Sequence, residues 1–407
     1  MKIALINNLY SKQKRGGAEI IVEKLKDALK KEGHNCFVIS TAPKNTIKNS
    51  SEKEDNNNYL ISSMYYNLHK FPYLIRLLWH LYKQLETRTV KDLKKILEKE
   101  KPDLVISHNL TGFSVKVYKL IDKLNIKHIH YLHDSQMLHP AGRIIYKHED
   151  IVNSLFARLY QRIQRYYSQK VNLIVSPSKW LLKLHQEKSF FKNTKVWQKF
   201  NPIESIKIDE IKGNSKFSFI YIGQIDENKG VELMIKAFIN IPKENDVELK
   251  IIGDGVALTD LKKKYNEYKN IKFLGRLSYE KSMQELSISN TLVLPSLIYE
   301  NSPTALFDAL KLNVDIIASD LGGISEIVRK YYGHLVYPYD IKSLSIAMEK
   351  SLRKNRVSEG SILGVIKENI QNIIQEKDKS INKKPVDLSD LQAQVYIKEL
   401  LEQLHLS

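Results

Sequence analysis

Residues 217–238 read FSFIYIGQIDENKGVELMIKAF, which predicts a short apolar strand at Phe217–Ile222, a glycine turn and an amphipathic helix. The same order of strand, loop and helix repeats on both sides of this segment. That alternation predicts a mostly parallel sheet with helices on both faces. The strands predicted outside it are Lys2–Asn7, Phe37–Ser40, Leu104–Ser107, His128–Leu132, Leu173–Val175, Leu249–Ile252, Ile271–Leu274, Thr291–Leu294 and Asp315–Ala318. We expect residues 44–58, rich in Asn, Ser and Lys, to form a loose insertion.

The alternation of strands and helices starts again near Asn201-Pro202, and a chain of 407 residues is longer than a domain with one hydrophobic core usually is. We therefore predict an α/β protein of two doubly wound, Rossmann-like domains that face each other across a cleft. The first domain is expected at residues 1–204 and the second at residues 205–386. A last helix, Leu388–Leu406, could pack back on the first domain from the segment 387–407.

Charge is distributed unevenly along the chain, which carries a net charge of +18. Residues 1–200 hold 36 basic and 17 acidic side chains, whereas the rest is close to neutral. Residues 151–200 hold ten basic residues and one acid. The excess predicts an anionic partner for the first half: a lipid-phosphate surface, a pyrophosphate-linked acceptor or nucleic acid. The alternative is a lysine-rich composition with a solvated surface.

Cysteine content and hydropathy bear on the compartment. Cys36 is the single cysteine, which excludes an internal disulfide and suits a reducing compartment. No stretch approaches the ~20 apolar residues of a membrane span. We expect a cytoplasmic protein that could bind the inner face of the membrane peripherally.

Two helices raise the question of membrane contact. The predicted helix 152–166 places Val152, Leu155, Phe156, Leu159 and Ile163 on one face and Arg158, Arg162 and Arg165 elsewhere. Such a helix could lie on an anionic membrane, or it could pack its apolar face on the domain. The segment Phe71–Tyr82 poses the same choice and could contact a lipid acceptor.

A second strand-to-helix loop in the C-terminal half is suited to phosphate. Ser302 is a good N-cap and Pro303 suits the first helical position, so the helix from Pro303 should aim its N–H groups at the mouth of the sheet. Glu300 could accept hydrogen bonds from sugar hydroxyls, and Asp308 shares a helix face with Thr304. A capped helix with surface acids is the alternative.

The loop of residues 223–230 joins the strand and helix quoted at the start. Gly223 lets the backbone turn, and Lys229 could reach a phosphate as a cation. Gly253 and Arg276 follow later strands and could line a nucleotide. Each of these features could also be an ordinary turn.

The first half offers a glycine loop and a histidine at strand ends. Gly16 and Gly17 follow the first strand but match neither a dinucleotide fingerprint nor a P-loop. His133-Asp134 ends the strand His128–Leu132, and a satisfied buried histidine is the alternative. No zinc-binding spacing occurs among the twelve histidines, so we expect no metal site.

Taken in order, these motifs resemble the family-four group of retaining GT-B glycosyltransferases (glycosyl transferases group 1) of surface-polysaccharide and glycolipid assembly. The resemblance covers nearly the whole chain and rests on residues 16–19, 101–103, 108–109, 131–134, 176–178, 201–203, 221–223, 229–231, 300–308 and 321–326. It implies a donor site formed by Gly17, Gly223, Gln224, Lys229, Gly253, Arg276, Glu300, Asn301, Ser302, Pro303, Thr304 and Asp308. It implies an acceptor side with Gly16, Gly17, His108 and Asp134.

The resemblance also implies catalytic roles. Lys229 would neutralise the donor diphosphate, Glu300 would contact the transferred sugar, and His133 would face the anomeric carbon. Two residues depart from the family: Gln224 stands where an arginine is usual, and Asp308 replaces the second glutamate of the E-x7-E motif. One positive charge is therefore missing, and the reach of Asp308 to a ribose is shortened.

We expect a retaining, metal-independent hexosyltransferase that needs no cofactor beyond its nucleotide-sugar substrate, with a UDP-sugar favoured. Its acceptor would be a glycan or a lipid-pyrophosphate-linked sugar. The alternatives are a non-catalytic GT-B-like partner protein and a nucleotide-sugar epimerase on the same fold. We expect no nucleic acid as partner, because no nucleic-acid motif accompanies the basic half.

Overall fold

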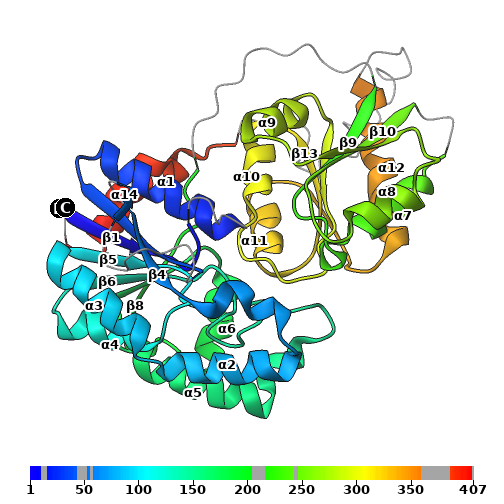
Figure 1. Cartoon of the computed structure of the whole chain (residues 1–407). Coiled ribbons are helices and arrows are strands. Elements are labelled where there is room, and N and C mark those ends of the chain that lie inside the picture. Colours follow the sequence, from blue (N-terminus) through cyan, green and yellow to red (C-terminus); the bar gives the residue numbers. More distant parts are fainter. Residues whose placement is uncertain are drawn as a thin grey trace. The chain divides into compact units, whose positions relative to one another are not determined.

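The computed structural model describes residues 1–10, 16–43, 53–55, 58–203, 216–242, 246–358 and 386–405. The chain divides into two compact units (Figure 1). Unit 1 comprises Met1–Ser205 and Ser389–Ser407, and unit 2 comprises Ile206–Leu388. Each unit is an α/β sheet with helices on its faces, which confirms the predicted fold class.

Unit 1 is built on one sheet with the strand order β3-β4-β2-β1-β5-β6-β7-β8. All neighbouring pairs are parallel except β3 and β4. The strands are β1 (Lys2–Ile6), β2 (Asn35–Ala42), β3 (Lys53–Asp55), β4 (Asn58–Ser62), β5 (Leu104–Ser107), β6 (Lys127–Tyr131), β7 (Leu173–Ser176) and β8 (Lys195–Gln198). The α-helices are α1 (Gly17–Lys31), α2 (Tyr73–Leu85), α3 (Arg88–Glu100), α4 (Lys116–Lys123), α5 (Leu155–Ser168), α6 (Lys179–Glu187) and α14 (Ala393–Glu402).

The core of unit 1 has two parts, one on each face of the sheet, because successive side chains of the central strand β1 point to opposite faces. Ile3 and Leu5 face α1 and the C-terminal helix α14, whereas Ala4 and Ile6 face α3 and α4. The hydroxyl of Tyr131 donates to that of Tyr396, 3.0 Å away, inside the first of these cores. The last helix is thus part of unit 1, and Figure 1 shows it beside α1.

Unit 2 carries a fully parallel sheet of order β11-β10-β9-β12-β13-β14. Its strands are β9 (Phe217–Ile222), β10 (Val247–Ile252), β11 (Ile271–Gly275), β12 (Thr291–Leu294), β13 (Asp315–Ser319) and β14 (His334–Val336). Its helices are α7 (Val231–Ile239), α8 (Leu258–Lys264), α9 (Tyr279–Ser287), α10 (Thr304–Lys311), α11 (Gly322–Lys330) and α12 (Ile341–Ser358). Helices α9, α10 and α11 cover one face, and α7, α8 and α12 cover the other (Figure 1).

The strand orders fix where ligands can bind. In unit 1 the order reverses between β1 and β5, and in unit 2 between β9 and β12. Loops leaving the carboxyl ends of these neighbours diverge to opposite faces and leave a crevice at the sheet edge. Most residues singled out from the sequence lie on loops or first helical turns at the carboxyl edges of the two sheets.

Two predicted segments differ from the structure. The loose insertion at residues 44–58 contains strand β3, which pairs antiparallel with β4; residues 44–52 and 56–57 lie outside the described residues. The predicted helix Leu388–Leu406 is interrupted. A 3-10 turn at Ser389–Leu391 precedes α14, because Gln392 forms a bridge with Ile203 that takes it out of the helix.

Candidate active site

Three strand-to-helix loops of unit 2 meet at the carboxyl edge of its sheet. The N–H of Gly323 donates to the carbonyl of Glu300 over 2.8 Å, and the N–H of Leu297 donates to the carbonyl of Asn228 over 2.9 Å. Gly230 has φ +70°, and a Cβ there would lie 2.0 Å from the carbonyl oxygen of Pro295. The loops after β9, β12 and β13 are therefore fixed against one another by their backbones.

This convergence brings Lys229 and Glu300 together. Lys229 ends a 3-10 turn at Glu227–Lys229, and its Nζ lies 3.1 Å from a carboxylate oxygen of Glu300. Both side chains are one-fifth exposed. A half-open pair of this kind holds a cation in place and leaves one side accessible to an anionic ligand.

The start of helix α10 lies directly after Glu300. The predicted N-cap at Ser302 is wrong: α10 begins at Thr304 with Pro303 as N-cap, because Pro303 has an extended ψ of 125°. Pro303 makes no side-chain capping bond, and the buried Oγ of Ser302 has no hydrogen-bond partner in the described part of the chain. The N–H groups of the first turn and their dipole therefore point to the edge that holds Lys229.

Asp308 lies one turn into α10 and is buried. The hydroxyl of Tyr279 in α9 donates to it over 3.0 Å, and Nζ of Lys311 lies 3.8 Å from the same oxygen. This carboxylate thus has structural partners on α9 and α10. Its role toward a ribose stays a prediction.

The remaining residues predicted on the donor side follow β9, β10 and β11. A Cβ on Gly253, which has φ +147°, would lie 1.8 Å from the carbonyl oxygen of Gly223. The N–H of Gly253 donates to the carbonyl of Gly275, next to the exposed Arg276. Gln224 is exposed, and its carbonyl accepts a 2.6 Å hydrogen bond from Tyr221. These loops lie on neighbouring strands, at the same edge as Lys229.

Replacing Gly323 with alanine should destabilise unit 2, because the new Cβ would lie 1.6 Å from the carbonyl oxygen of Asn301. Overpacking of this kind costs about 1–3 kcal/mol or more, so we expect the Tm to fall by about 5 °C or more. Gly17→Ala is the matched control, since a Cβ there meets nothing within 4 Å. Equal Tm values for the two variants, measured by calorimetry, would contradict this packing.

The glycine loop of unit 1 is described only from Gly16 onward, because residues 11–15 lie outside the described residues. Gly16 and Gly17 are exposed at the start of α1, and the N–H of Gly16 donates to the carboxylate of Glu19 over 2.7 Å. Burial raises the pKa of Asp134 to about 7, and the negative charge of Glu19 adds to this shift. The start of α1 and the loop after β6 are therefore electrostatic neighbours.

His108 and His133 follow the adjacent strands β5 and β6, and the structure brings them together. Nδ1 of His108 lies 2.8 Å from Nε2 of His133, and the His108 ring stacks on Tyr131. Burial lowers the pKa of His133 to about 4 and holds that of His108 well below its ordinary value. Both rings are neutral at pH 7 and serve as hydrogen-bonding groups.

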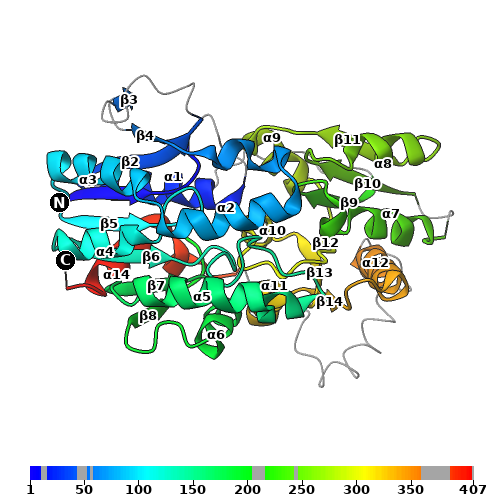
Figure 2. The same ribbon diagram turned by 60° about the horizontal axis from the view of Figure 1, so that its bottom comes forward.

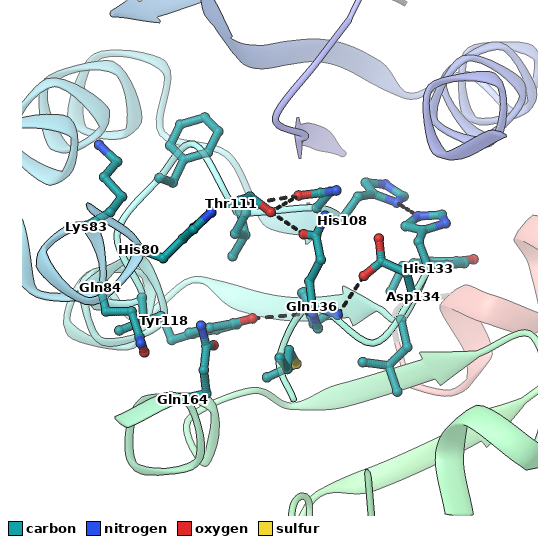
Figure 3. A pocket seen from close by; sticks show the side chains of 18 of the residues that line it. His80, Lys83, Gln84, His108, Thr111, Tyr118, His133, Asp134, Gln136 and Gln164 are labelled. Atoms are coloured by element: carbon teal, nitrogen blue, oxygen red, sulfur yellow. Dashed lines mark hydrogen bonds between the residues drawn. The ribbon is translucent and has the colours of Figure 1, made fainter. Parts of the chain in front are cut away.

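His108, His133 and Asp134 line a pocket of unit 1, shown in Figure 3. The sequence motifs missed several other polar side chains of its lining, among them His80, Lys83, Gln84, Thr111, Gln136 and Gln164. The signal that could have found several of them is a polar side in otherwise apolar α2: Lys83 and Gln84 are buried. Lys83 pairs with Glu86 at 3.0 Å, and burial lowers the pKa of Lys83.

The predicted apolar face of helix 152–166 is only partly right, since Phe156 and Ile163 are half-buried but the other three residues lie elsewhere. Val152 belongs to a separate 3-10 turn, because Ser154 accepts from the N–H of Ala157 and starts α5 at Leu155. Leu155 and Leu159 are exposed. The buried face contains Gln161 and Gln164 instead, and Nε2 of Gln161 donates to the carbonyls of Leu138 and Val152.

The arginines of α5 are also placed differently from the prediction. Arg158 and Arg162 are exposed on the same side as Leu155 and Leu159, since these positions are three or four residues apart. Arg165 is half-buried, and it donates to the carbonyl of Lys188 over 2.9 Å. The alternative in which α5 packs its apolar face on the domain therefore holds for Phe156 and Ile163, which are half-buried, but not for Leu155 and Leu159.

Across the ranges the structure describes, no group of three or more His, Cys, Asp and Glu side chains is arranged to hold a metal ion. Within those same ranges, no helix has both the length and the apolar character needed to cross a bilayer.

Comparison with known proteins agrees with this architecture. The family Glycosyl transferases group 1 matches residues 203–361, and Glycosyltransferase Family 4 matches residues 15–203. An uncharacterised protein of the cps region of Klebsiella pneumoniae is 28% identical over 335 residues, which is 81% of this chain and 88% of that protein. The Escherichia coli O-antigen biosynthesis glycosyltransferase WbnH is 24% identical and covers 60% of this chain and 67% of its own length.

Among solved structures, Anabaena HepE in complex with UDP superposes with a TM-score of 0.65 at 15% identity, and the match covers 99% of this chain and all of HepE. Two Rossmann-like units, each with candidate binding loops at the carboxyl edge of its sheet, are the architecture of the GT-B class. With both halves of the chain matched by the corresponding families, this protein belongs to the group 1 glycosyltransferases.

Proposed function

We propose that this glycosyltransferase moves a hexose from a nucleoside-diphosphate sugar, with UDP as the favoured nucleotide, to a glycan or a lipid-linked acceptor in surface-polysaccharide assembly. The observation that carries the proposal is the pairing of Lys229 with Glu300 directly before the start of α10. HepE binds UDP, and WbnH is named for O-antigen biosynthesis. Both support this choice of donor and product.

In this mechanism the diphosphate is already a good leaving group. Lys229 and the first-turn N–H groups of α10 would stabilise the departing negative charge, so no metal ion is needed for that purpose. Glu300 would orient Lys229 and accept hydrogen bonds from sugar hydroxyls. His133, neutral at pH 7, would contact the transferred sugar, and the configuration at the anomeric carbon would be retained.

The excess of basic side chains in residues 1–200 supports an anionic acceptor or an anionic membrane as the partner of this half, on the cytoplasmic side of the membrane. Gln224 leaves the diphosphate with one cation fewer than the family usually provides. We expect this to weaken donor binding without removing Lys229 from the site.

A panel of nucleoside diphosphates and nucleotide sugars tests the proposal by thermal shift, because a ligand at about 100 times its Kd stabilises the native state by about 2.7 kcal/mol. We expect UDP or a UDP-sugar to raise the Tm and adenosine alone to leave it unchanged. NMR analysis of the products formed with a panel of acceptors then determines the anomeric configuration of the new glycosidic bond. Conversion of the donor without acceptor would indicate an epimerase, and binding without turnover a non-catalytic partner; either result would overturn the proposal.

A further inference from the structure

Helices α2 and α5 present large apolar side chains to the solvent. We define the apolar face as Leu74, Leu78 and Tyr82 of α2 with Leu155 and Leu159 of α5. Leu155 is 83% exposed and Leu74 is 67% exposed, and the other three are more than half exposed. On each helix these positions are four residues apart, so they form one stripe.

The inner sides of the same helices are polar, the reverse of an ordinary surface helix. Lys83 and Gln84 of α2 and Gln164 of α5 are buried and line the pocket that also holds His133. The two helices contact each other and run side by side in Figures 1 and 2. Each apolar stripe therefore lies on the side of its helix away from that pocket, where nothing in the described chain covers it. A contiguous exposed apolar surface marks an interaction site.

The charges on these helices identify the occupant. Neither α2 nor α5 contains an acidic residue. Arg158 and Arg162 are exposed and stand between the exposed leucines of α5. Apolar side chains that alternate with arginines on one exposed face are typical of helices that lie in the interface of an anionic bilayer. A protein partner would have to offer acidic groups between apolar ones, whereas an anionic lipid surface supplies both.

We propose that the apolar face docks this enzyme on the surface of an anionic lipid bilayer, so that a lipid-linked acceptor reaches the pocket lined by the inner sides of α2 and α5. The leucines would enter the acyl boundary and the arginines would contact lipid phosphates. The docking deepens the proposed function, and its link to a lipid-linked acceptor rests on that function.

Flotation with vesicles tests the docking directly. The intact protein should bind phosphatidylglycerol–phosphatidylcholine vesicles much more tightly than pure phosphatidylcholine vesicles, and added salt should weaken this binding. Arg158→Gln with Arg162→Gln should weaken it about 25-fold, since each basic residue near an anionic surface strengthens binding about fivefold. Leu155→Glu with Leu159→Glu should abolish it.

The matched control is Val256→Glu with Tyr337→Glu, which places the same charges at two apolar positions of unit 2 that are at least as exposed. This variant should bind vesicles as the unchanged protein does. All variants should keep the same Tm and the same circular dichroism, because the altered side chains are exposed. Equal vesicle binding by the leucine variant and the control would overturn the proposal. So would a leucine variant that changes only the oligomeric state, measured by light scattering, because a second copy would then be the occupant.

The thermal shift with UDP separates this inference from the proposed function. In the leucine variant the UDP-induced shift should be unchanged while vesicle binding is lost. A protein that binds vesicles through the apolar face but no nucleoside diphosphate would instead refute the proposed function and leave the docking surface intact.

Discussion

Replacing Lys229 with alanine should lower kcat by about 10²–10³-fold while the protein stays folded. This is the loss seen when one preorganised group that stabilises developing negative charge is removed. Nζ of Lys229 lies 3.1 Å from Glu300, next to the start of α10. Lys229 is the only cationic residue of the loop 223–230, so no other side chain of this loop can take its place. Steady-state kinetics with saturating donor measure the loss, and the shift in Tm caused by UDP should also decrease.

Lys236→Ala is the matched control for that experiment. Lys236 lies on α7, seven residues away, and forms an exposed ion pair with Glu232 at 3.1 Å. Exposed pairs of this kind contribute about 0–1 kcal/mol, so neither activity nor Tm should change measurably. If Lys229→Ala and Lys236→Ala showed the same turnover, the assigned role of Lys229 would be wrong.

The fold could be predicted because its strands are short apolar runs with clear ends. The structure confirms Leu104–Ser107, Phe217–Ile222 and Thr291–Leu294 to the residue. Pro102 before the first run and Gly223 after the second mark those ends. Parallel strands that are buried on both faces appear in the sequence as short apolar runs. Their buried backbone groups must be hydrogen-bonded, and neighbouring strands supply those bonds.

The meeting of His108 and His133 could also be anticipated in part. Both residues follow predicted strands, and carboxyl ends of parallel strands share one edge of a sheet. The strand order, which makes β5 and β6 neighbours, comes from packing of the whole unit. The sequence motifs therefore named the two residues, and only the fold placed their ring nitrogens 2.8 Å apart.

The errors have a common physical cause. Helical periodicity shows which residues of α5 share a side, but it does not show which side the rest of the chain covers. Polar Gln161 is buried because two backbone carbonyls accept from it, a fact of tertiary structure. At α10, likewise, the close contact of Gly323 with Asn301 helps to fix the residues ahead of the helix, and the local preference for a serine cap at Ser302 is overridden.

Lowering the pH from 7 to 5 should destabilise unit 1 strongly. Burial lowers the pKa of His128 to about 3 and those of His133 and His185 to about 4, and it holds His108 and His130 well below their ordinary values. Below pH 6.5 the unfolded chain binds protons at these sites, whereas the folded chain does not. Each site then removes about 1.4 kcal/mol of unfolding free energy per pH unit until its folded pKa is reached.

One group opposes this trend. The raised pKa of Asp134, about 7, means that the folded state binds its proton first, so this carboxyl adds stability as the pH falls from 7 toward 4. Five histidines against one carboxyl leave a net loss of several kcal/mol by pH 5, a large part of the ~5–15 kcal/mol of a typical domain.

Urea unfolding at pH 7, 6 and 5 measures this loss, and unit 2 serves as an internal reference because His334 is its single histidine. The buried hydroxyl of Ser107 lies 2.7 Å from His128 and 2.8 Å from His130, so charging either ring would place a cation among neutral partners. His128→Gln keeps a hydrogen-bonding side chain but no titration, and it should therefore reduce the pH dependence while lowering stability at pH 7. Unit 1 stability that stayed constant between pH 7 and 5 would mean that water reaches these rings, and their burial as neutral groups would be refuted.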